Sequence, residues 1–439
     1  MSRLFDDSTL QRLARPPEED ALDALRHGDL ETVRRHLDEM DAGPAGLDAL
    51  SGHTLARKIG KLRADFGEAR TRAELQRIGT QLMRSWAEQW AAGDAKGAIA
   101  DLVAIFRYQT GGRLQALQED AQAVTLQLAP CGSGGRLERQ KLPERHPAAY
   151  GGWSDGVSSY CQGCKANQAA LNAALGGPAW TTEKGPDGHC RLRFDKLAQR
   201  GQTLFDAREK VQLTRTRVQQ ARERLDAGDT DIAPLLEGQR KDWRPWHDFG
   251  VVWLAHFYAV ALDLGGPDYL DEMLAQTYEP AFVAGFPRYA ALDDAGLVRE
   301  IARTWNYHCA DFRVHEEEDR FVFTLDPCGS GGRLFRGQMW RDLFRYGQPL
   351  SPIVPGPHPI VFMRRDAPSY CSHCAASNRT QLSRAADRTV PLFFVIDGTA
   401  QQQPGMPCRT YVYKKDADRR GIEARLFEMV GLAPPSVDA

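Results

Sequence analysis

Six of the nine cysteines stand in two groups that have the same order of motifs. In each group a cysteine opens the heptapeptide CGSGGRL, and a Tyr-Cys-x-x-Cys follows further along the chain. Two residues between cysteines allow both sulfur atoms to reach one ion, and thiolates are preferred ligands of zinc. The chemistry that these residues can do is therefore metal binding. The cysteines are Cys131, Cys161 and Cys164 in the first group and Cys328, Cys371 and Cys374 in the second.

One histidine, followed by proline, lies between the heptapeptide and the paired cysteines of each group: His146 and His358. Three thiolates and one imidazole complete a tetrahedral shell. The sequence thus predicts two zinc ions per chain, one for each group. A shell of four protein ligands is typical of structural zinc, whereas a catalytic zinc keeps one position open.

Cys190 and Cys408 also occur at equivalent places, each directly before an arginine. We expect them to be buried thiols on core strands, because unpaired cysteines are common core residues. The alternative is that they replace His146 and His358 as fourth ligands, which would give two four-cysteine sites.

The glycines after the first cysteine of each group predict a tight turn. Such a turn can direct successive N–H groups at the thiolate sulfur or at an anion. Arg136 and Arg333 follow the turn, and a guanidinium can hold a carboxylate through two parallel hydrogen bonds. The alternative is that each arginine pairs with a nearby acid. We expect Arg333, with Gly331 and Gly332, to bind substrate and Arg136 to be structural.

A tryptophan-rich segment, DWRPWHDFGVVWLAHFYAV at 242–260, precedes the second group. Its equivalent before the first group, SGHTLARKIGKLRADFG at 51–67, lacks the tryptophans, and His53 there roughly matches His247 in position. The aromatic residues of 242–260 predict a packed helix, and this segment also contains His247 beside Asp248. An imidazole next to a carboxylate is the usual arrangement of a general base. His247 and Asp248 are therefore the catalytic candidates, in a pocket shared with Arg333.

The similarity between the two groups extends into the elements that must position them. Residues 119–137 align without gaps with 316–334, and both alternate apolar and polar residues as a half-buried strand does. A helix is predicted after each Tyr-Cys-x-x-Cys, and closing strands are predicted at 189–196 and 407–414. The sequence predicts an α+β fold formed by tandem duplication of a unit with N-terminal helices followed by a small antiparallel sheet and a zinc-binding loop.

The predicted organisation has four parts along the chain. Helical spacing with many charges predicts a solvated connecting helix between two units. The parts are a poorly ordered leader at 1–21, a first unit at 22–204, the connecting helix at 205–228 and a second unit at 229–439.

Composition narrows the class of protein. Hydrophobic residues make up 42% of the chain and the formal net charge is −2, which favours a globular protein without a nucleic-acid partner. The N-terminus lacks the apolar core of a secretory signal, and the most apolar stretch, at 249–266, is short and contains His256 and Asp263. We expect a cytoplasmic protein with reduced cysteines and no membrane partner.

Three segments of the second unit carry a resemblance to a known family. FVFTLDPC (321–328), YCSHC (370–374) and LFFVIDGTAQQQPGMPCRTYVY (392–413), after a helical lead-in, resemble the L-2-amino-thiazoline-4-carboxylic acid hydrolase-like family. The resemblance covers about half of each unit, and the His-containing loop and the CGSGGR glycines depart from it. It implies a small amino-carboxylate substrate and hydrolysis of a C–N bond, and it carries no catalytic residue across.

Two functions are therefore expected. The first is a zinc-binding bacterial enzyme that acts on a small amino or carboxylate substrate in a specialised metabolic pathway. The alternative is a non-catalytic binding or scaffold protein stabilised by zinc. A metal-bound water that exchanges would favour the enzyme, whereas four protein ligands would favour the scaffold.

Overall fold

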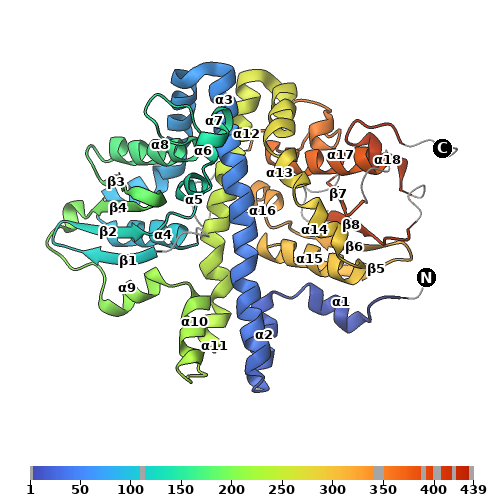
Figure 1. Cartoon of the computed structure of the whole chain (residues 1–439), viewed down its shortest axis with the longest axis horizontal. Helices are drawn as coiled ribbons and strands as arrows, with labels where there is room; N and C mark the ends of the chain where they lie inside the picture. The colour runs from blue at the N-terminus through green and yellow to red at the C-terminus, as the bar shows by residue number, and fades with distance from the viewer. Residues whose placement is uncertain are drawn as a thin grey trace. The chain divides into compact units, whose positions relative to one another are not determined.

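The computed structural model describes residues 3–108, 114–339, 351–386, 392–398, 407–417 and 422–434. Helices and two four-stranded antiparallel sheets make up this part of the chain, which confirms the predicted α+β class (Figure 1). The chain divides into two compact units. Unit 2 contains residues 17–253, and unit 1 contains the described residues of 1–16 and 254–439.

Unit 2 contains the first cysteine group. Its sheet has the strand order β1-β2-β4-β3, with every neighbouring pair antiparallel. Helix α8 packs against the long helix α3 and against β3. The strands are β1 (Leu114–Glu119), β2 (Ala123–Leu128), β3 (Trp180–Lys184) and β4 (Cys190–Asp195). The helices are α2 (Pro17–Arg26), α3 (Leu30–Ala91), α4 (Ala95–Arg107), α5 (Gly134–Arg139), α6 (Leu142–Arg145), α7 (Pro147–Tyr150), α8 (Ser159–Ala174), α9 (Ala207–Thr214), α10 (Arg217–Asp226), α11 (Ala233–Glu237) and the first part of α12 (Gln239–Thr277).

Unit 1 contains the second cysteine group. Its sheet has the order β5-β6-β8-β7, again antiparallel throughout. Apolar residues of the strands, of α15 and of the N-terminal segment form one buried cluster. The strands are β5 (Phe312–Glu316), β6 (Arg320–Leu325), β7 (Val395–Asp397) and β8 (Cys408–Tyr413). The helices are α1 (Asp7–Leu13), the rest of α12, α13 (Glu279–Val283), α14 (Phe286–Ala291), α15 (Asp294–Tyr307), α16 (Gly331–Phe335), α17 (Ser372–Ala386) and α18 (Ala424–Glu428).

A buried carboxylate ties the sheet of unit 2 to the segment that follows it. Glu119, at the end of β1, forms an ion pair of 2.8 Å with Lys196, and both side chains are almost fully buried. The backbone N–H groups of Leu204 and Phe205 also donate to this carboxylate. Burial alone would raise the pKa of Glu119, but these hydrogen bonds lower it to about 2. The carboxylate is therefore charged in the folded protein at neutral pH.

Unit 1 has the same kind of contact, but its partner segment is the N-terminus. Glu316, at the end of β5, forms a buried ion pair of 2.9 Å with Lys414. The backbone N–H groups of Leu4 and Phe5 donate to its carboxylate at 2.7 Å and 3.0 Å. The region expected to be a poorly ordered leader thus differs from that expectation, because Phe5 and Leu10 of its described part are buried in the core of unit 1.

The division of the chain also differs from the one expected from sequence. The structural boundary at 253/254 falls within helix α12. The segment 205–228 does not form one connecting helix but two helices, α9 and α10, within unit 2. The physical reason is a pair of capping boxes, because Asp206 caps α9 and Thr216 caps α10 and each starts a helix of its own.

One apolar stretch passes a test for membrane spans. The described chain has one helical region, 233–291, that is long and apolar enough to cross a membrane by length and composition. Half of its most apolar window is buried inside the protein.

Candidate functional site

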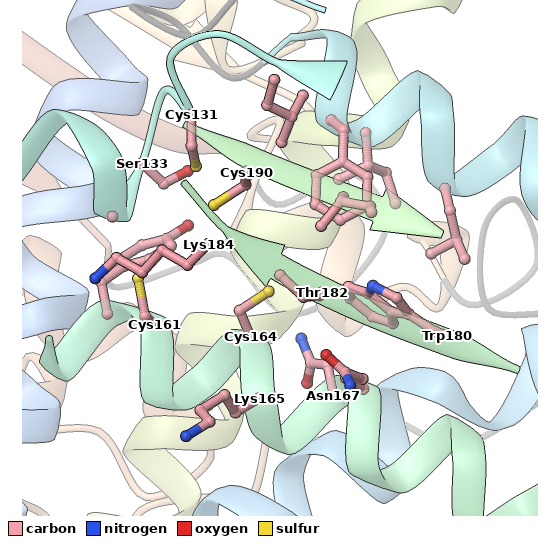
Figure 2. Close-up of a pocket in the computed structure, with 18 of the residues that line it drawn as sticks. Cys131, Ser133, Cys161, Cys164, Lys165, Asn167, Trp180, Thr182, Lys184 and Cys190 are labelled. Carbon is pink, nitrogen blue, oxygen red and sulfur yellow. The ribbon is translucent and has the colours of Figure 1, made fainter. Parts of the chain in front are cut away.

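Four cysteines of unit 2 come together at one cavity. Cys131 lies in the turn after β2, and Cys161 and Cys164 lie three residues apart in the first turns of α8, on one face of that helix. Cys190 is the first residue of β4, where it pairs with the end of β2. All four line the same cavity, and Figure 2 shows their side chains gathered on one side of it.

The glycine turn directs backbone N–H groups at the first of these sulfur atoms. The Cys190 thiol donates to Cys131 and is the main cause that lowers the pKa of Cys131 to about 6. Burial opposes this shift, and the N–H groups of Gly135 and Ser133 support it. Gly134 is required because a Cβ there would lie 2.3 Å from the sulfur of Cys161. The turn thus brings its backbone close to two cysteines.

The paired cysteines of α8 are in a different electrostatic environment. Burial, with a smaller contribution from the neighbouring Cys131, raises the pKa of Cys161 to about 12. Burial also raises the pKa of Cys164, with a contribution from the same two cysteines. The two cysteines of α8 therefore hold their protons more tightly than Cys131 does.

Arg136 holds the glycine turn against α3. Its guanidinium donates to the Asp48 carboxylate at 2.9 Å and to the Asp48 carbonyl oxygen at 3.1 Å. Only 12% of the arginine side chain and 6% of the aspartate side chain are exposed. This buried pair is the arrangement expected if the arginine has a structural role.

His146 lies elsewhere in unit 2. Its side chain is exposed, and it stands at the N-terminus of the short helix α7. It does not line the cavity that contains the four cysteines. In this unit it is Cys190, rather than the histidine, that accompanies Cys131, Cys161 and Cys164.

The cavity beside the cysteines has a volume of about 480 Å³. Its lysines, Lys165 and Lys184, each have an acidic partner, Asp155 at 2.8 Å and Glu138 at 2.5 Å. The rest of its wall is largely apolar and aromatic, with contributions from α4, α12 and the sheet. These residues include Leu102, Phe106, Trp180, Leu192, Phe249 and Trp253.

The second cysteine group has a similar arrangement in unit 1. The backbone N–H of Gly332 donates to the Cys328 sulfur at 3.5 Å, so this turn too directs an N–H group at its cysteine. Burial raises the pKa of Cys374, and nearby cysteines contribute to the shift. Those cysteines are Cys371, Cys328 and Cys408.

His358 is engaged outside this cysteine group. Its Nδ1 accepts a hydrogen bond from the backbone N–H of Ile360 at 3.2 Å. That leaves Nε2 to donate to the Asp268 carboxylate at 3.1 Å. Both ring nitrogens therefore have partners other than a metal. Part of the surrounding loop, residues 340–350, lies outside the described residues.

The predicted catalytic and substrate residues fall in different units. His247 Nδ1 lies 3.0 Å from Asp248 Oδ1, as expected for neighbouring partners, but both side chains are buried and neither lines the unit 2 cavity. Gly331, Gly332 and Arg333 are buried in α16 of unit 1. Neither unit by itself assembles the substrate pocket that was expected from these five residues.

The cysteines converge without standing in a finished coordination shell. Within the described ranges, no three or more His, Cys, Asp or Glu side chains are arranged so that they could hold a metal ion as they stand. A metal at this place would have to draw the sulfur atoms of unit 2 closer together.

Sequence reasoning missed three polar residues in the cavity wall: Asn167, Trp180 and Thr182. A signal for them was present. Asn167 follows Cys164 by three residues and therefore shares its helix face. Trp180 and Thr182 alternate along β3 and therefore share a face of the sheet. The sequence does not show which strand packs against which helix.

Comparison with known proteins does not extend this description, since no protein-family model, curated protein or solved structure matches the chain.

Proposed function

We propose that this is a zinc-binding protein in which a four-cysteine centre holds the binding cavity of unit 2 together. The observation that carries the proposal is the convergence of Cys131, Cys161, Cys164 and Cys190 from three separate elements on one end of that cavity. Thiolate ligands select soft or borderline metals, and four of them suit tetrahedral zinc. A second zinc, bound by the cysteines of unit 1, gives two per chain.

The proposed role of the metal is structural, and the protein acts by binding a small molecule rather than by hydrolysing one. Four thiolates would close the coordination shell and leave no position for a reacting water. The buried His247–Asp248 pair does not line the cavity, so it is not placed to move a proton there. We propose a cytoplasmic location, no nucleic-acid partner and no membrane partner for this binding protein.

The second candidate is the hydrolase that the family resemblance implies. What favours it is a cavity of about 480 Å³ directly beside potential metal ligands, which is large enough for a small amino-carboxylate. Against it, both cavity lysines already have acidic partners, Asp155 and Glu138. A substrate carboxylate would have to compete with these acids.

We also infer that the two units derive from a tandem duplication. The sheets have equivalent strand orders, and each has a buried glutamate–lysine pair at the end of its first strand. The backbone angles of the repeated turn agree, with φ −100° and ψ −97° at Ser133 and φ −103° and ψ −92° at Ser330. These features support a common origin of both cysteine groups.

The test compares Cys190→Ser with His146→Ala in full-length protein. Zinc content and affinity are measured by elemental analysis and competition with a chromophoric chelator. Loss of a residue that only hydrogen-bonds to a metal ligand typically lowers metal affinity about 10- to 100-fold. We expect Cys190→Ser, which removes a ligand, to lower zinc affinity by at least that much. His146→Ala should leave zinc affinity unchanged. X-ray absorption on the parent should show sulfur ligands alone.

A larger loss of zinc affinity in His146→Ala than in Cys190→Ser would identify His146 as the fourth ligand. Iron and sulfide in the purified protein would instead identify a cluster, which four cysteines can also bind. For the hydrolase candidate, release of product from 2-aminothiazoline-4-carboxylate by the zinc-loaded parent would establish it.

A further inference from the structure

Polar groups in the wall of the unit 2 cavity lack hydrogen-bond partners within the described protein. The indole Nε1 of Trp180 and the hydroxyl of Thr182 are buried without a partner, and so is the hydroxyl of Ser133 beside the cysteines. The Asn167 side chain is 5% exposed and lines the same wall. Figure 2 shows Asn167, Trp180 and Thr182 on facing elements, α8 and β3.

Unpaired polar groups of this kind are costly in a folded protein. A buried donor without an acceptor costs about 1–3 kcal/mol, and most such groups in native proteins have a partner. Asn172, on the same helix, shows the usual outcome, because its amide makes hydrogen bonds with both backbone groups of Trp180. The unpaired groups of the cavity therefore call for a partner that enters from outside.

Their chemistry defines the polar part of that partner. An indole N–H can only donate, a hydroxyl can donate or accept, and an amide can do both. The complementary group is an acceptor with a donor beside it, as in an amide, a lactam or a nucleobase edge. A carboxylate fits less well, since Lys165 and Lys184 are already paired with acids.

The remaining wall defines the apolar part. The rings of Phe106 and Trp180 meet edge to face at 5.9 Å, and those of Phe249 and Trp253 lie 5.7 Å apart. Aromatic walls favour flat rings, because such pairs gain energy from stacked and edge-on contacts beyond the area they bury. The volume of about 480 Å³ lies within the range of small-molecule sites.

We infer that the cavity of unit 2 binds a flat, uncharged, largely apolar molecule through an amide-like edge that meets Asn167, Trp180 and Thr182. This inference rests on the proposed function, because the cysteine centre holds the cavity in which the three residues lie, and it adds the chemical class of the ligand. The cysteines form one end of the cavity, and the ligand occupies the aromatic remainder.

The test uses two compounds of matched shape on full-length protein of known metal content. Isoquinolin-1(2H)-one has a lactam edge, and naphthalene has the same two fused rings without it. Binding is followed by isothermal titration calorimetry. We expect the lactam to bind more tightly than naphthalene, by about 2- to 12-fold for each neutral hydrogen bond formed.

Variants then identify the side chains that form hydrogen bonds with the lactam edge. Asn167→Leu, Trp180→Phe and Thr182→Val keep most of the side-chain volume and remove the polar atoms, so each should reduce the preference for the lactam while naphthalene affinity stays within about twofold. Thr181→Val is the matched control, because Thr181 lies on the same strand but does not line the cavity; it should change neither affinity.

The inference is overturned if neither compound binds the parent, if the parent binds both equally, or if the three cavity variants keep the parent's preference. Zinc content is measured in the same samples. Samples that contain zinc but show no preference for the lactam contradict the ligand proposal alone, whereas samples without zinc contradict the metal proposal.

Discussion

Two buried carboxylates of unit 2 each fix a loop segment to a distant part of the chain. Asp48 anchors the glycine turn through Arg136, and Glu119 anchors the chain after the sheet through Lys196 and two backbone N–H groups. Each acid joins segments that are far apart in the sequence. A charge that is buried and paired in this way is expensive to leave without its partner.

The pKa of Glu119 predicts how acid affects unit 2. Its folded-state pKa, about 2, is below the unfolded value of about 4.3. The stabilisation is therefore complete above the unfolded pKa and is lost as the pH falls through about 2. Glu119→Gln should cost about 3–5 kcal/mol at pH 7, since Lys196 would keep a buried charge without a partner. The variant should also lose the pH dependence between about 4.3 and 2.

Urea unfolding at several pH values between 2 and 7 measures this difference. Glu183→Gln is the control, because Glu183 is 76% exposed and lies 3.7 Å from Arg191. An exposed pair of this kind contributes about 0–1 kcal/mol. Stability curves of the parent and Glu119→Gln that run parallel across the whole pH range would contradict the prediction.

Asp48 gives a second prediction, for the metal centre. Asp48→Asn keeps the shape of the side chain but removes the charge that faces Arg136, so the glycine turn should be held less firmly. Supporting residues of metal sites typically contribute about 10- to 100-fold in affinity, and we expect a loss of zinc affinity in that range. Asp38→Asn, at a largely exposed aspartate paired with Arg222, should have no effect. Equal chelator competition in both variants would show that Arg136 does not support the site.

The element that sequence reasoning undervalued most is the N-terminal segment. Phe5 is 7% exposed and contacts the ring of Phe321 on β6, and Leu10 of α1 is 2% exposed. The segment is short and charged, and residues 1–21 were expected to form a poorly ordered leader. Its order comes from a distant partner, Glu316, and no local pattern reveals that partner.

Phe5→Ala should destabilise unit 1 by about 3–5 kcal/mol, the usual cost of removing a buried aromatic ring. Hydrogen exchange with mass spectrometry should show faster exchange in β5 and β6 of the variant. Leu4→Ala removes an adjacent side chain that is 45% exposed and should leave both measurements unchanged. Similar exchange in the two variants would mean that the ring does not hold the sheet.

Local patterns were sufficient for the elements around the cysteines. The alternating segments became β2 and β6, the predicted closing strands became β4 and β8, and each Tyr-Cys-x-x-Cys lies at the start of a helix. The spacing of apolar residues and the capping of helices depend on residues that are close in the sequence, so both can be predicted from the sequence. The place of Cys190 was not readable in that way, because it depends on the register that pairs it with Leu128 on β2.

At the scale of the whole molecule, the two cysteine groups lie in different units. The expected catalytic site combined His247 and Asp248 with Arg333. Sequence order alone suggested that these residues belong to the same unit. His247 belongs to unit 2 and Arg333 to unit 1, because the unit boundary falls within α12, six residues after His247.

Independent centres predict independent metal loss. Cys371→Ser should reduce the zinc content from two per chain to one and should increase hydrogen exchange around α17 while β3 and β4 stay protected. Cys161→Ser should do the reverse, with the loss confined to unit 2. Loss of both metals in either single variant would show that the two centres are coupled.

The N-terminal segment also has a consequence for synthesis on the ribosome. The described residues of unit 2 have all emerged once residue 253 has been made, so they can fold while the following residues are still being translated. Residues 3–16 emerge before unit 2, yet their docking site on β5 and the last strand that completes that sheet, β8, are translated some three hundred to four hundred residues later. Phe5 and Leu10 must therefore remain undocked until those strands have been made, and a chaperone that binds short apolar segments would find its target there.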